Sequence, residues 1–562
     1  MTSASLLAHP GLLLVAAGVA AFWLRGGART FVVLAAPLAA GALLWTLPEG
    51  AGGRASLLGW ELAALRVDAL GRLFATIFAL MAFAGALFAL RQPSRLEVPA
   101  ALVYAGAAVG AVLAGDLLTL FVCWELMALG STLVLWSAGD AAARAARRYL
   151  LVHLFGGMLL MAGIAGYVLD TGSIAFEAMR ADNLANGLIL AGFLLNAAAP
   201  PFSSWLPDAY PEASWSGMVF LSAFTTKTAV YVLLRGFPGT EILVAIGLFM
   251  IFYGIVYAIL ENDMRRILAY SIVNQVGFMV VGAGLGTEMA INGAAAHAFT
   301  HIIYKALLLM SAGSVLLQTG RRKCTDLGGL IQSMPLTAWC GIVGALSISS
   351  FPLTSGFVSK SMISQVAADQ HLAAVWLLLA AASAGVFLHA GIKFPWFVFF
   401  QKDSGLRPPD PPAPMRAAML LFAFLCIAIG VAPATLYALL PYPVHYLPYT
   451  AGHVVAQLQL LLFSGLAFFL LLPWLRRTLT ITLDLDWGYR RLGPAAVGFA
   501  EHLRRRTGDA ARPLLASLAA RASSLAAWLL GPTAPFGGTW STRAIGLATA
   551  GLLVLVLLAS YR

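Results

Sequence analysis

Charged residues are scarce in this sequence. Only 10% of its 562 residues are Asp, Glu, Lys or Arg, whereas 60% are hydrophobic and the mean hydropathy is +0.86. Soluble domains ordinarily carry about 25% charged residues. The scarcity of charge therefore excludes a sizeable soluble domain and indicates a protein that crosses the membrane many times.

Cysteines are also few. Cys123, Cys324, Cys340 and Cys426 form no close pair and have no metal-ligand spacing, so the sequence predicts no metal site and no bound cofactor. A glycine-rich dinucleotide motif and a haem motif are missing too, so we expect no redox centre in the chain itself. The net charge of +11 does not indicate a nucleic-acid partner, because the basic residues lie in short loops between apolar segments.

Apolar segments long enough to cross a bilayer recur throughout the chain. They predict an all-α polytopic membrane protein with about 14–16 transmembrane helices. The first apolar run has no basic leading region and no small-residue cleavage site, so we expect a first span and not a signal peptide. The predicted spans are 5–24, 30–47, 70–90, 98–115, 117–138, 149–169, 184–203, 216–235, 241–260, 267–284, 290–316, 336–357, 372–398, 415–440, 455–473 and 543–560.

Prolines interrupt two of these spans at similar places. One break contains Pro200 and Pro201 in the stretch 194–210, and the other contains Pro352 in the stretch 346–360. Proline removes a backbone donor, and the freed carbonyls in a bilayer must meet protein or water. Paired broken helices point to an inverted-repeat transporter with its ion path at the breaks.

The breaks suggest a division of the chain into parts. Segments 98–235 and 241–398 would be the two repeats, and a stretch of Arg-rich turns alternating with Leu and Ala would lie on the cytoplasmic surface. The predicted parts are 1–97 (N-terminal membrane helices), 98–235, 241–398, 415–473 (C-terminal membrane helices), 484–534 (amphipathic surface segment) and 543–560 (final span).

Arginines set the expected orientation. They follow the first, third and fifth spans, for example at Arg25, Arg91 and Arg147, whereas the even-numbered loops are poorer in basic residues. The positive-inside rule then places the odd-numbered loops in the cytoplasm and the N-terminus outside. The loop PDAYPEA, which follows the seventh span, has no basic residue and does not support this. We expect a multi-pass protein of the inner membrane of a prokaryote, in contact with membrane lipid.

Lysines are rarer than arginines and differently placed. Of the six, only two are in loops, and Lys227, Lys305, Lys360 and Lys393 lie in or at the edge of apolar spans. Arginine stays protonated, whereas a desolvated lysine can lose its proton, as a proton path requires. Each unpaired charge at the bilayer centre costs at least about 2.5–3.5 kcal/mol. Lys360 and Lys393 lie near span ends, so for them an anchoring role at the membrane surface remains the alternative.

The stretch HAFTHIIYKALLLM contains three titratable residues at a spacing of four. His297, His301 and Lys305 should form one helix stripe about 12 Å long, which could relay protons with Thr300 and Tyr304 beside it. A metal site is the alternative for two histidines at this spacing. It is disfavoured because no third ligand lies close by and Lys305 would repel a cation.

Glu125, in FVCWELMALGS, is the only carboxylate near the middle of a span. An ionisable group inside the membrane is a functional hypothesis by default. The alternative is a buried acid that pairs with an arginine or a hydroxyl for packing alone.

Several motifs together resemble a known family. They are WELMALGS, PPFSSWLPDAYPEA, TTKTAVYVLLR, NDMRRILAYSIVNQVGF, HAFTHIIYKALLLMSAGSV and PLTSGFVSK. The chain resembles the antiporter-like membrane subunits shared by respiratory complex I and the Mrp-type cation/proton antiporters, and looks closest to the D-type Mrp subunits. The resemblance covers most of residues 60–400.

The resemblance implies two inverted five-helix repeats and a line of charged residues along the membrane mid-plane. Glu125, Lys227, His301, Lys305 and Lys360 match the family pattern. The sequence departs from it at Asn196, where the family has a broken-helix lysine that pairs with the glutamate. Either Lys227 alone provides the positive charge that partners Glu125, or this half of the protein does not conduct protons.

These observations predict a proton-translocating membrane subunit of a multisubunit monovalent cation/proton antiporter. Its expected partners are other membrane subunits, protons, and Na⁺ or K⁺. One alternative is a proton-pumping membrane-arm subunit of a complex I-like or hydrogenase-like redox complex. Another is a coupling or structural subunit of a non-redox complex, such as one for inorganic-carbon uptake.

Overall fold

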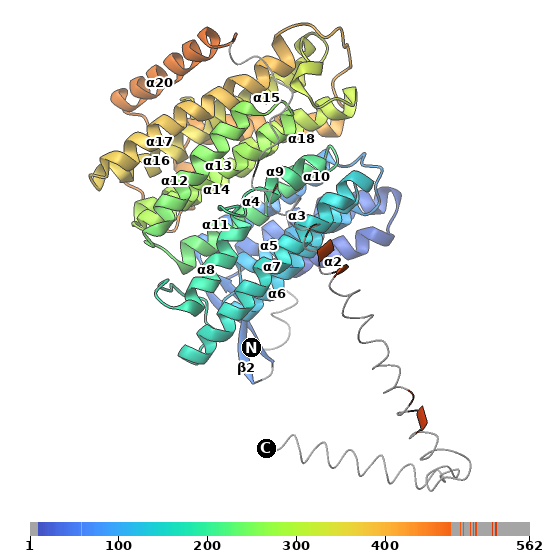
Figure 1. Cartoon of the computed structure of the whole chain (residues 1–562), viewed down its shortest axis with the longest axis vertical. Coiled ribbons are helices and arrows are strands. Elements are labelled where there is room, and N and C mark those ends of the chain that lie inside the picture. The colour runs from blue at the N-terminus through green and yellow to red at the C-terminus, as the bar shows by residue number, and fades with distance from the viewer. Residues whose placement is uncertain are drawn as a thin grey trace. The chain divides into compact units, whose positions relative to one another are not determined.

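The computed structural model describes residues 9–57 and 59–473, together with a few isolated positions from Asp484 to Ser524. The predicted surface segment 484–534, apart from those positions, and the predicted final span 543–560 lie outside the described residues. The helices are α2 (Pro10–Trp23), α3 (Gly26–Thr46), α4 (Ala69–Phe88), α5 (Glu97–Val112), α6 (Leu117–Trp136), α7 (Asp140–Thr171), α8 (Leu184–Asn196), α9 (Trp205–Ala209), α10 (Gly217–Leu221), α11 (Thr225–Gly236), α12 (Ile242–Leu260), α13 (Met264–Leu285), α14 (Glu288–Thr319), α15 (Pro335–Ile348), α16 (Ser355–Asp369), α17 (Ala373–Val386), the π-helices η4 (Phe387–Lys393) and η5 (Trp396–Phe400), α18 (Ala413–Val431), α19 (Ala434–Tyr437) and α20 (Ala451–Leu470) (Figure 1).

Helices dominate the described residues, as the sequence predicts. Eleven helical stretches are long and apolar enough to cross a membrane. Every predicted span before residue 474 falls on one or more helices. The α-helical fold class and the multi-pass membrane character are therefore confirmed.

Helix ends differ from the prediction where charged residues continue a helix. Helix α7 begins at Asp140, well before the expected residue 149, and its first turns carry Arg144, Arg147 and Arg148. Helix α16 continues to Asp369, beyond the expected residue 357. Hydropathy marks only the apolar part of such a helix, although the polar turns beyond it keep the same backbone hydrogen bonds.

A two-stranded hairpin, which the sequence analysis did not predict, connects α3 to α4. Strands β1 (Gly50–Leu57) and β2 (Trp60–Val67) pair antiparallel, with Gly50 opposite Val67. The stretch WELAALRV lacks a clean alternation of apolar and polar residues, which is the usual sign of a strand. The backbone N–H of Gly115 donates to the carbonyl of Ala63 at 2.8 Å, so the hairpin is bound to the loop before α6.

Three central helices are shielded from lipid by the others. Nearly all side chains of α11, α13 and α14 are buried. Helices α3, α7 and α20 instead expose large apolar side chains such as Phe31, Met158 and Leu462. Figure 1 shows α13 and α14 among the other helices of the second half. Polar groups on the central helices are thus kept away from the hydrocarbon phase.

Both spans that the sequence predicts to be interrupted by proline are broken. Helix α8 ends at Asn196 and α9 begins at Trp205, with Pro200 and Pro201 between them. Helix α15 ends at Ile348 and α16 begins at Ser355, with Pro352 in the gap.

The two broken helices end with the same backbone closure. Ala198 and Ser350 have positive φ angles of 60° and 58°. The N–H groups that follow them, of Ala199 and Phe351, donate to the carbonyls of Leu194 and Leu346 respectively, each at 3.0 Å. This is the closure of a Schellman motif, which usually has glycine at the left-handed position. The shared closure supports the expectation that the two segments are counterparts, and the inverted repeat stays a prediction.

Arginines of the second half hold the loop PDAYPEA of the first half. Arg265, at the start of α13, donates to the carbonyls of Pro211 at 3.0 Å, Ala213 at 2.7 Å and Ser214 at 2.7 Å. Arg322 forms ion pairs with Glu212 at 2.9 Å and with Asp263 at 2.7 Å. The loop therefore needs no basic residue of its own, which explains why it did not follow the charge rule.

Candidate functional site

Lys227 lies at a helix interruption that the sequence analysis missed. Helix α10 ends at Leu221 and α11 begins at Thr225, although one continuous span was expected. The Lys227 Nζ donates to the freed carbonyl of Ser222 at 2.7 Å and to the Thr226 hydroxyl at 3.0 Å. A buried ammonium group thus satisfies a carbonyl that the break leaves without a helical partner.

His297, His301 and Lys305 lie on α14 and are all fully buried. The ring centroids of the two histidines are 6.2 Å apart, and the Tyr304 ring is 5.2 Å from that of His301. A helix that faced lipid could not carry these groups, and α14 is surrounded by protein on nearly all sides. The stripe therefore faces the interior of the protein.

His297 connects three helices through hydrogen bonds. Its Nε2 lies 3.1 Å from the Gln275 Oε1 of α13, and the Tyr304 hydroxyl donates to the same Oε1 at 3.1 Å. Its Nδ1 lies 3.3 Å from the hydroxyl of Ser359, the neighbour of Lys360 on α16. The Thr300 hydroxyl also lies 2.8 Å from that of Ser359. Gln275 was not predicted; its signal was the polar pair Asn274–Gln275 in an otherwise apolar span.

Three other side chains of this region have no hydrogen-bond partner among the described residues. The unpartnered atoms are both ring nitrogens of His301 and the Nζ atoms of Lys305 and Lys360. The Lys360 Nζ lies 4.4 Å from the centre of the Phe278 ring, which gives a cation–π contact. Buried polar groups without partners are costly, so water or loss of the proton must offset the cost.

The charged groups lie within electrostatic reach of one another. Helices α11 and α16 both pack against α14, so Lys227 and Lys360 lie near the titratable groups of α14. In the described part of the chain, none of Lys227, Lys305 and Lys360 has a carboxylate at ion-pair distance. The structure thus brings five predicted residues into one buried region formed by α11, α14 and α16. We call Lys227, His297, His301, Lys305 and Lys360 the lysine–histidine line.

Glu125 stands apart from this line. Its side chain lies against α7, where a Cβ added at Gly157 would come 2.0 Å from the Glu125 Oε1. That oxygen has no hydrogen-bond partner within residues 9–57 and 59–473. The neighbours of Glu125 on α6, Val122 and Leu129, are 65% and 49% exposed, so this part of α6 is close to the lipid. Among the described residues, neither an arginine nor a lysine forms an ion pair with it.

Asn196 binds a histidine that the sequence analysis did not single out. The Asn196 Oδ1 lies 2.8 Å from the Nδ1 of His153, and both residues are buried. The His153 ring packs against Tyr149 at 4.1 Å and Trp205 at 4.6 Å. A lone histidine in an apolar span gives no signal in a sequence. Asn196 is thus engaged by His153 and not by Glu125 in the part of the chain that the structure describes.

Lys393 has a different environment from the other lysines of the spans. Its Nζ donates to three carbonyls at the end of α12: Ala258 at 3.1 Å, Glu261 at 2.5 Å and Ile259. A cation at this place satisfies terminal carbonyls and complements the helix dipole. The geometry supports the structural alternative for Lys393. The buried His389, one turn earlier, is within electrostatic reach of Lys305 and Lys360 and was also not predicted.

Metal binding was not expected, and the described residues contain no group of three or more His, Cys, Asp and Glu side chains that could hold a metal ion. Cys324, Cys340 and Cys426 are buried and Cys123 is partly buried, all as free thiols.

Comparisons with known proteins show a family match and several similar proteins. Residues 114–387 match the family described as NADH:quinone oxidoreductase/Mrp antiporter, TM. The probable A/B-type K⁺/H⁺ antiporter subunit of Rhizobium meliloti is 31% identical over 402 residues, which are 66% of this chain and 40% of that protein. The D-type Na⁺/H⁺ antiporter subunit of Alkalihalophilus pseudofirmus is 32% identical over 274 residues, 45% of this chain and 55% of that protein. This chain thus spans about half the length of these two relatives.

Another relative is covered more fully. Hydrogenase-4 component B of Escherichia coli is 25% identical over 499 residues, 79% of this chain and 73% of that protein.

Two solved structures share the fold. A chain of the Mrp complex from Dietzia sp. superposes with a TM-score of 0.78 at 24% identity, over 92% of this chain and 62% of that one. A chain of the membrane-bound sulfane sulfur reductase, an archaeal respiratory membrane complex, superposes with a TM-score of 0.72 at 24% identity, over 98% and 99%. Over residues 114–387 this chain is thus similar to the NADH:quinone oxidoreductase/Mrp antiporter transmembrane family, and the named relatives carry the same similarity.

Proposed function

We propose that this chain is a proton-translocating membrane subunit of a multisubunit monovalent cation/proton antiporter. Protons would move along the lysine–histidine line, and other membrane subunits of the complex would handle or share the Na⁺ or K⁺. The chain itself would carry out no redox chemistry.

One observation carries the proposal: three buried lysines, without carboxylate partners among the described residues, share a region with two buried histidines. Structural lysines are ordinarily paired or reach the membrane surface. At an effective dielectric of about 20, two charges about 8 Å apart interact with about 2 kcal/mol. Such an energy changes the protonation equilibrium of a neighbour about thirtyfold. A proton that arrives at one lysine can therefore drive a proton away from the next.

The location follows the expected charge distribution. The chain would lie in the inner membrane of a prokaryote with the loops rich in arginine in the cytoplasm. The loop that joins α13 to α14 would then face outward, and the loop that joins α14 to α15, with Arg321 and Arg322, would face the cytoplasm.

Transport assays on the complete complex in membrane vesicles test this function. We expect Lys227→Ala and Lys360→Ala each to slow proton movement at least about tenfold, because each removes a proton carrier that no neighbour replaces. Lys402→Ala, a change of an exposed loop lysine, is the matched control and should retain the full rate. Unchanged proton movement in both buried-lysine variants, at normal assembly, would refute the proposal.

A redox complex is the second candidate. The observation that favours it is the relative named hydrogenase-4 component B, of which this chain covers 73%. In such a complex the same lysine–histidine line would move protons, but substrate oxidation in another protein of the complex would drive them. Proton movement that depends on an electron donor and not on Na⁺ or K⁺ would favour this candidate.

A further inference from the structure

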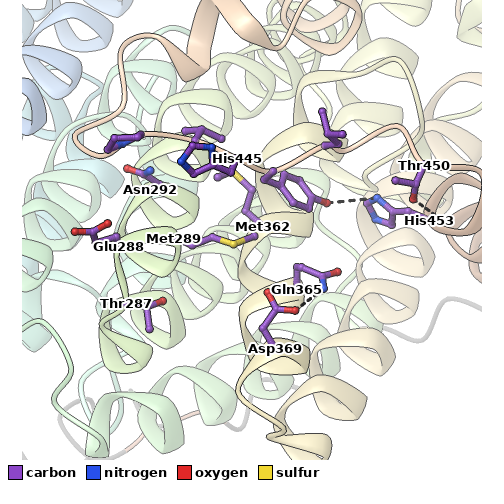
Figure 2. Close-up of a pocket in the computed structure, with 14 residues that line it drawn as sticks. Thr287, Glu288, Met289, Asn292, Met362, Gln365, Asp369, His445, Thr450 and His453 are labelled. Atoms are coloured by element: carbon purple, nitrogen blue, oxygen red, sulfur yellow. Dashed lines mark hydrogen bonds between the residues drawn. The ribbon is translucent and has the colours of Figure 1, made fainter.

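Two cavities lie near Lys360, and nothing in the proposed function uses them. The first, which we call the mouth cavity, has a volume of about 750 Å³ and lies where α14 begins and α16 ends. Figure 2 shows Glu288 from α14, Gln365 and Asp369 from α16, and His453 from α20 around it. The second, which we call the lysine cavity, has a volume of about 230 Å³ and lies between α16, α17 and α20.

The lysine cavity is suited to hold water. Its polar lining includes Lys360, Ser361, Ser364 and Gln457. The Lys360 Nζ is buried and has no hydrogen-bond partner among the described residues. A site needs room and two to four polar groups to hold a water molecule, and this cavity offers both. Water there would lie beside the Lys360 side chain, whose ammonium group has no hydrogen-bond partner among the described residues.

His453 and Gln365 line both cavities. The His453 ring stacks on Phe357, one turn before Lys360 on α16, with centroids 4.6 Å apart and an interplanar angle of 19°. The Nδ1 of His453 lies 2.8 Å from the carbonyl of Pro448 and 3.4 Å from the Tyr446 hydroxyl. The ring is thus held at the boundary between the two cavities.

The hydrogen bonds of His453 define its chemistry. A carbonyl can only accept, so in the neutral ring Nδ1 carries the proton and Nε2 keeps its lone pair. Burial raises the pKa of Tyr446 to about 12, so this phenol remains protonated near neutral pH. The Nε2 atom is therefore the one ring position that can take up a proton.

We propose that His453 relays protons between the mouth cavity and Lys360. Nε2 accepts a proton from water in one cavity and becomes part of an imidazolium, while Nδ1 keeps its own proton. Nε2 then gives this proton to water in the other cavity, and the ring returns to its neutral form. Glu288 and Asp369 at the mouth attract cations and so favour the supply of protons. The inference rests on the proposed function and adds a residue of α20, outside the matched segment 114–387, to the path.

Proton flux in vesicles that contain the complete complex tests the relay. We expect His453→Phe, which can keep the stacking on Phe357 but cannot carry a proton, to slow flux at least about tenfold. His371→Asn is the control, because His371 is exposed and lines neither cavity, and it should stay within about twofold of the unchanged protein.

Removal of the ring separates a relay from a merely structural role. His453→Ala joins the cavities through water, so it should be slowed much less than His453→Phe, which keeps them apart and cannot carry a proton. Unchanged flux in His453→Phe, or an equal loss in both variants, would overturn the relay.

Thiol labelling tests the connection of the cavities without any transport. In a variant whose four natural cysteines are replaced, Ser364→Cys places a thiol in the lysine cavity. A charged, membrane-impermeant thiol reagent on the side of residues 286–287 should label it at least about fivefold faster after His453→Ala, because removal of the ring joins the cavities. Leu377→Cys, at an exposed position of α17, should stay unlabelled in the lipid. An equal labelling rate with and without the His453 ring would refute the boundary role even if the proposed function holds.

Discussion

At the scale of single residues, similar side chains have different environments. The Lys393 ammonium group donates to three carbonyls at the end of α12. The ammonium groups of Lys305 and Lys360, in contrast, have no hydrogen-bond partner in the described part of the chain. The Lys227 ammonium group lies between these cases, because it satisfies one carbonyl and one hydroxyl at a break. The surroundings of each ammonium group therefore distinguish a lysine that holds a helix end from a candidate proton carrier, and the identity of the residue does not.

Lys393→Met should lower stability and leave the proton rate of the assembled protein unchanged. Methionine fills a similar volume but leaves three carbonyls at the end of α12 without their donor. Hydrogen bonds to a charged group are worth about 1.5–3 kcal/mol each, so the thermal midpoint of the purified complex should fall clearly. Light scattering of the heated complex in detergent gives the midpoint. A normal midpoint with a slowed proton rate would instead assign Lys393 to the path.

Glu125→Gln should slow proton movement much less than Lys227→Ala does. The Glu125 carboxylate lies against α7 and has no cation at ion-pair distance among the described residues, so no direct pair couples its charge to the lysine–histidine line. Rates from vesicles of equal protein content make the comparison. A loss in Glu125→Gln as large as that in Lys227→Ala would show that the first half takes part in conduction.

Sequence reasoning named the charged residues but not their hydrogen-bonded neighbours. Lysines and histidines inside apolar spans are conspicuous because the lipid excludes them. Gln275, His153 and His453 are not, because a single polar residue in a span is compatible with many roles. Which of the predicted residues meet is decided by packing between helices far apart in the chain, as for His297 and Ser359.

At the scale of helices, the second break depends on a close backbone contact. A Cβ added at Gly356 would come 1.8 Å from the carbonyl oxygen of Ser347, so no larger residue fits where α16 begins against α15. Because the nearest atom is backbone, a small side-chain adjustment cannot relieve the contact.

Gly356→Ala should therefore prevent normal closure of the break and reduce the amount of assembled complex several-fold. An overpacked contact of this kind typically costs about 1–3 kcal/mol or more. Gly187→Ala is the matched control: it is also a helical glycine next to a broken span, but nothing lies within 4 Å of its added Cβ. Size-exclusion profiles of membranes solubilised under identical conditions measure the two variants. Equal assembly of both would contradict the contact.

Helix positions were predictable to the extent that hydropathy reveals them. The prolines marked the breaks in α8–α9 and α15–α16, because proline acts on its own segment. The interruption between α10 and α11 has no proline or glycine within it, and the carbonyl it frees is met by Lys227. The hairpin β1–β2 was not predicted because its residues show no strand pattern. The two strands form through their pairing with each other, which the composition of the segment does not reveal.

At the scale of the whole molecule, the proteins that assemble with this chain distinguish the antiporter from the redox complex. We expect that a tagged chain, extracted gently from its native membrane, will co-purify with small hydrophobic membrane subunits and support proton flux driven by Na⁺ or K⁺. The reason is the match of residues 114–387 to a family of antiporter and respiratory membrane subunits, together with three buried lysines that have no carboxylate partner among the described residues. Mass spectrometry of the purified complex identifies the partners. Proteins that carry flavin or iron–sulfur clusters would instead favour the redox candidate.

The arginines that hold the loop PDAYPEA also limit how the molecule can move. Arg265 and Arg322 join the two halves at one end of the helices, and the ion pair of Arg322 with Glu212 adds to three bonds from Arg265 to backbone. A transporter that rocks one half against the other would have to break these hydrogen bonds and this ion pair in every cycle. These bonds favour a static scaffold, in which the proposed proton transfer would proceed by the rotation of side chains and the rearrangement of water while the two halves keep their positions.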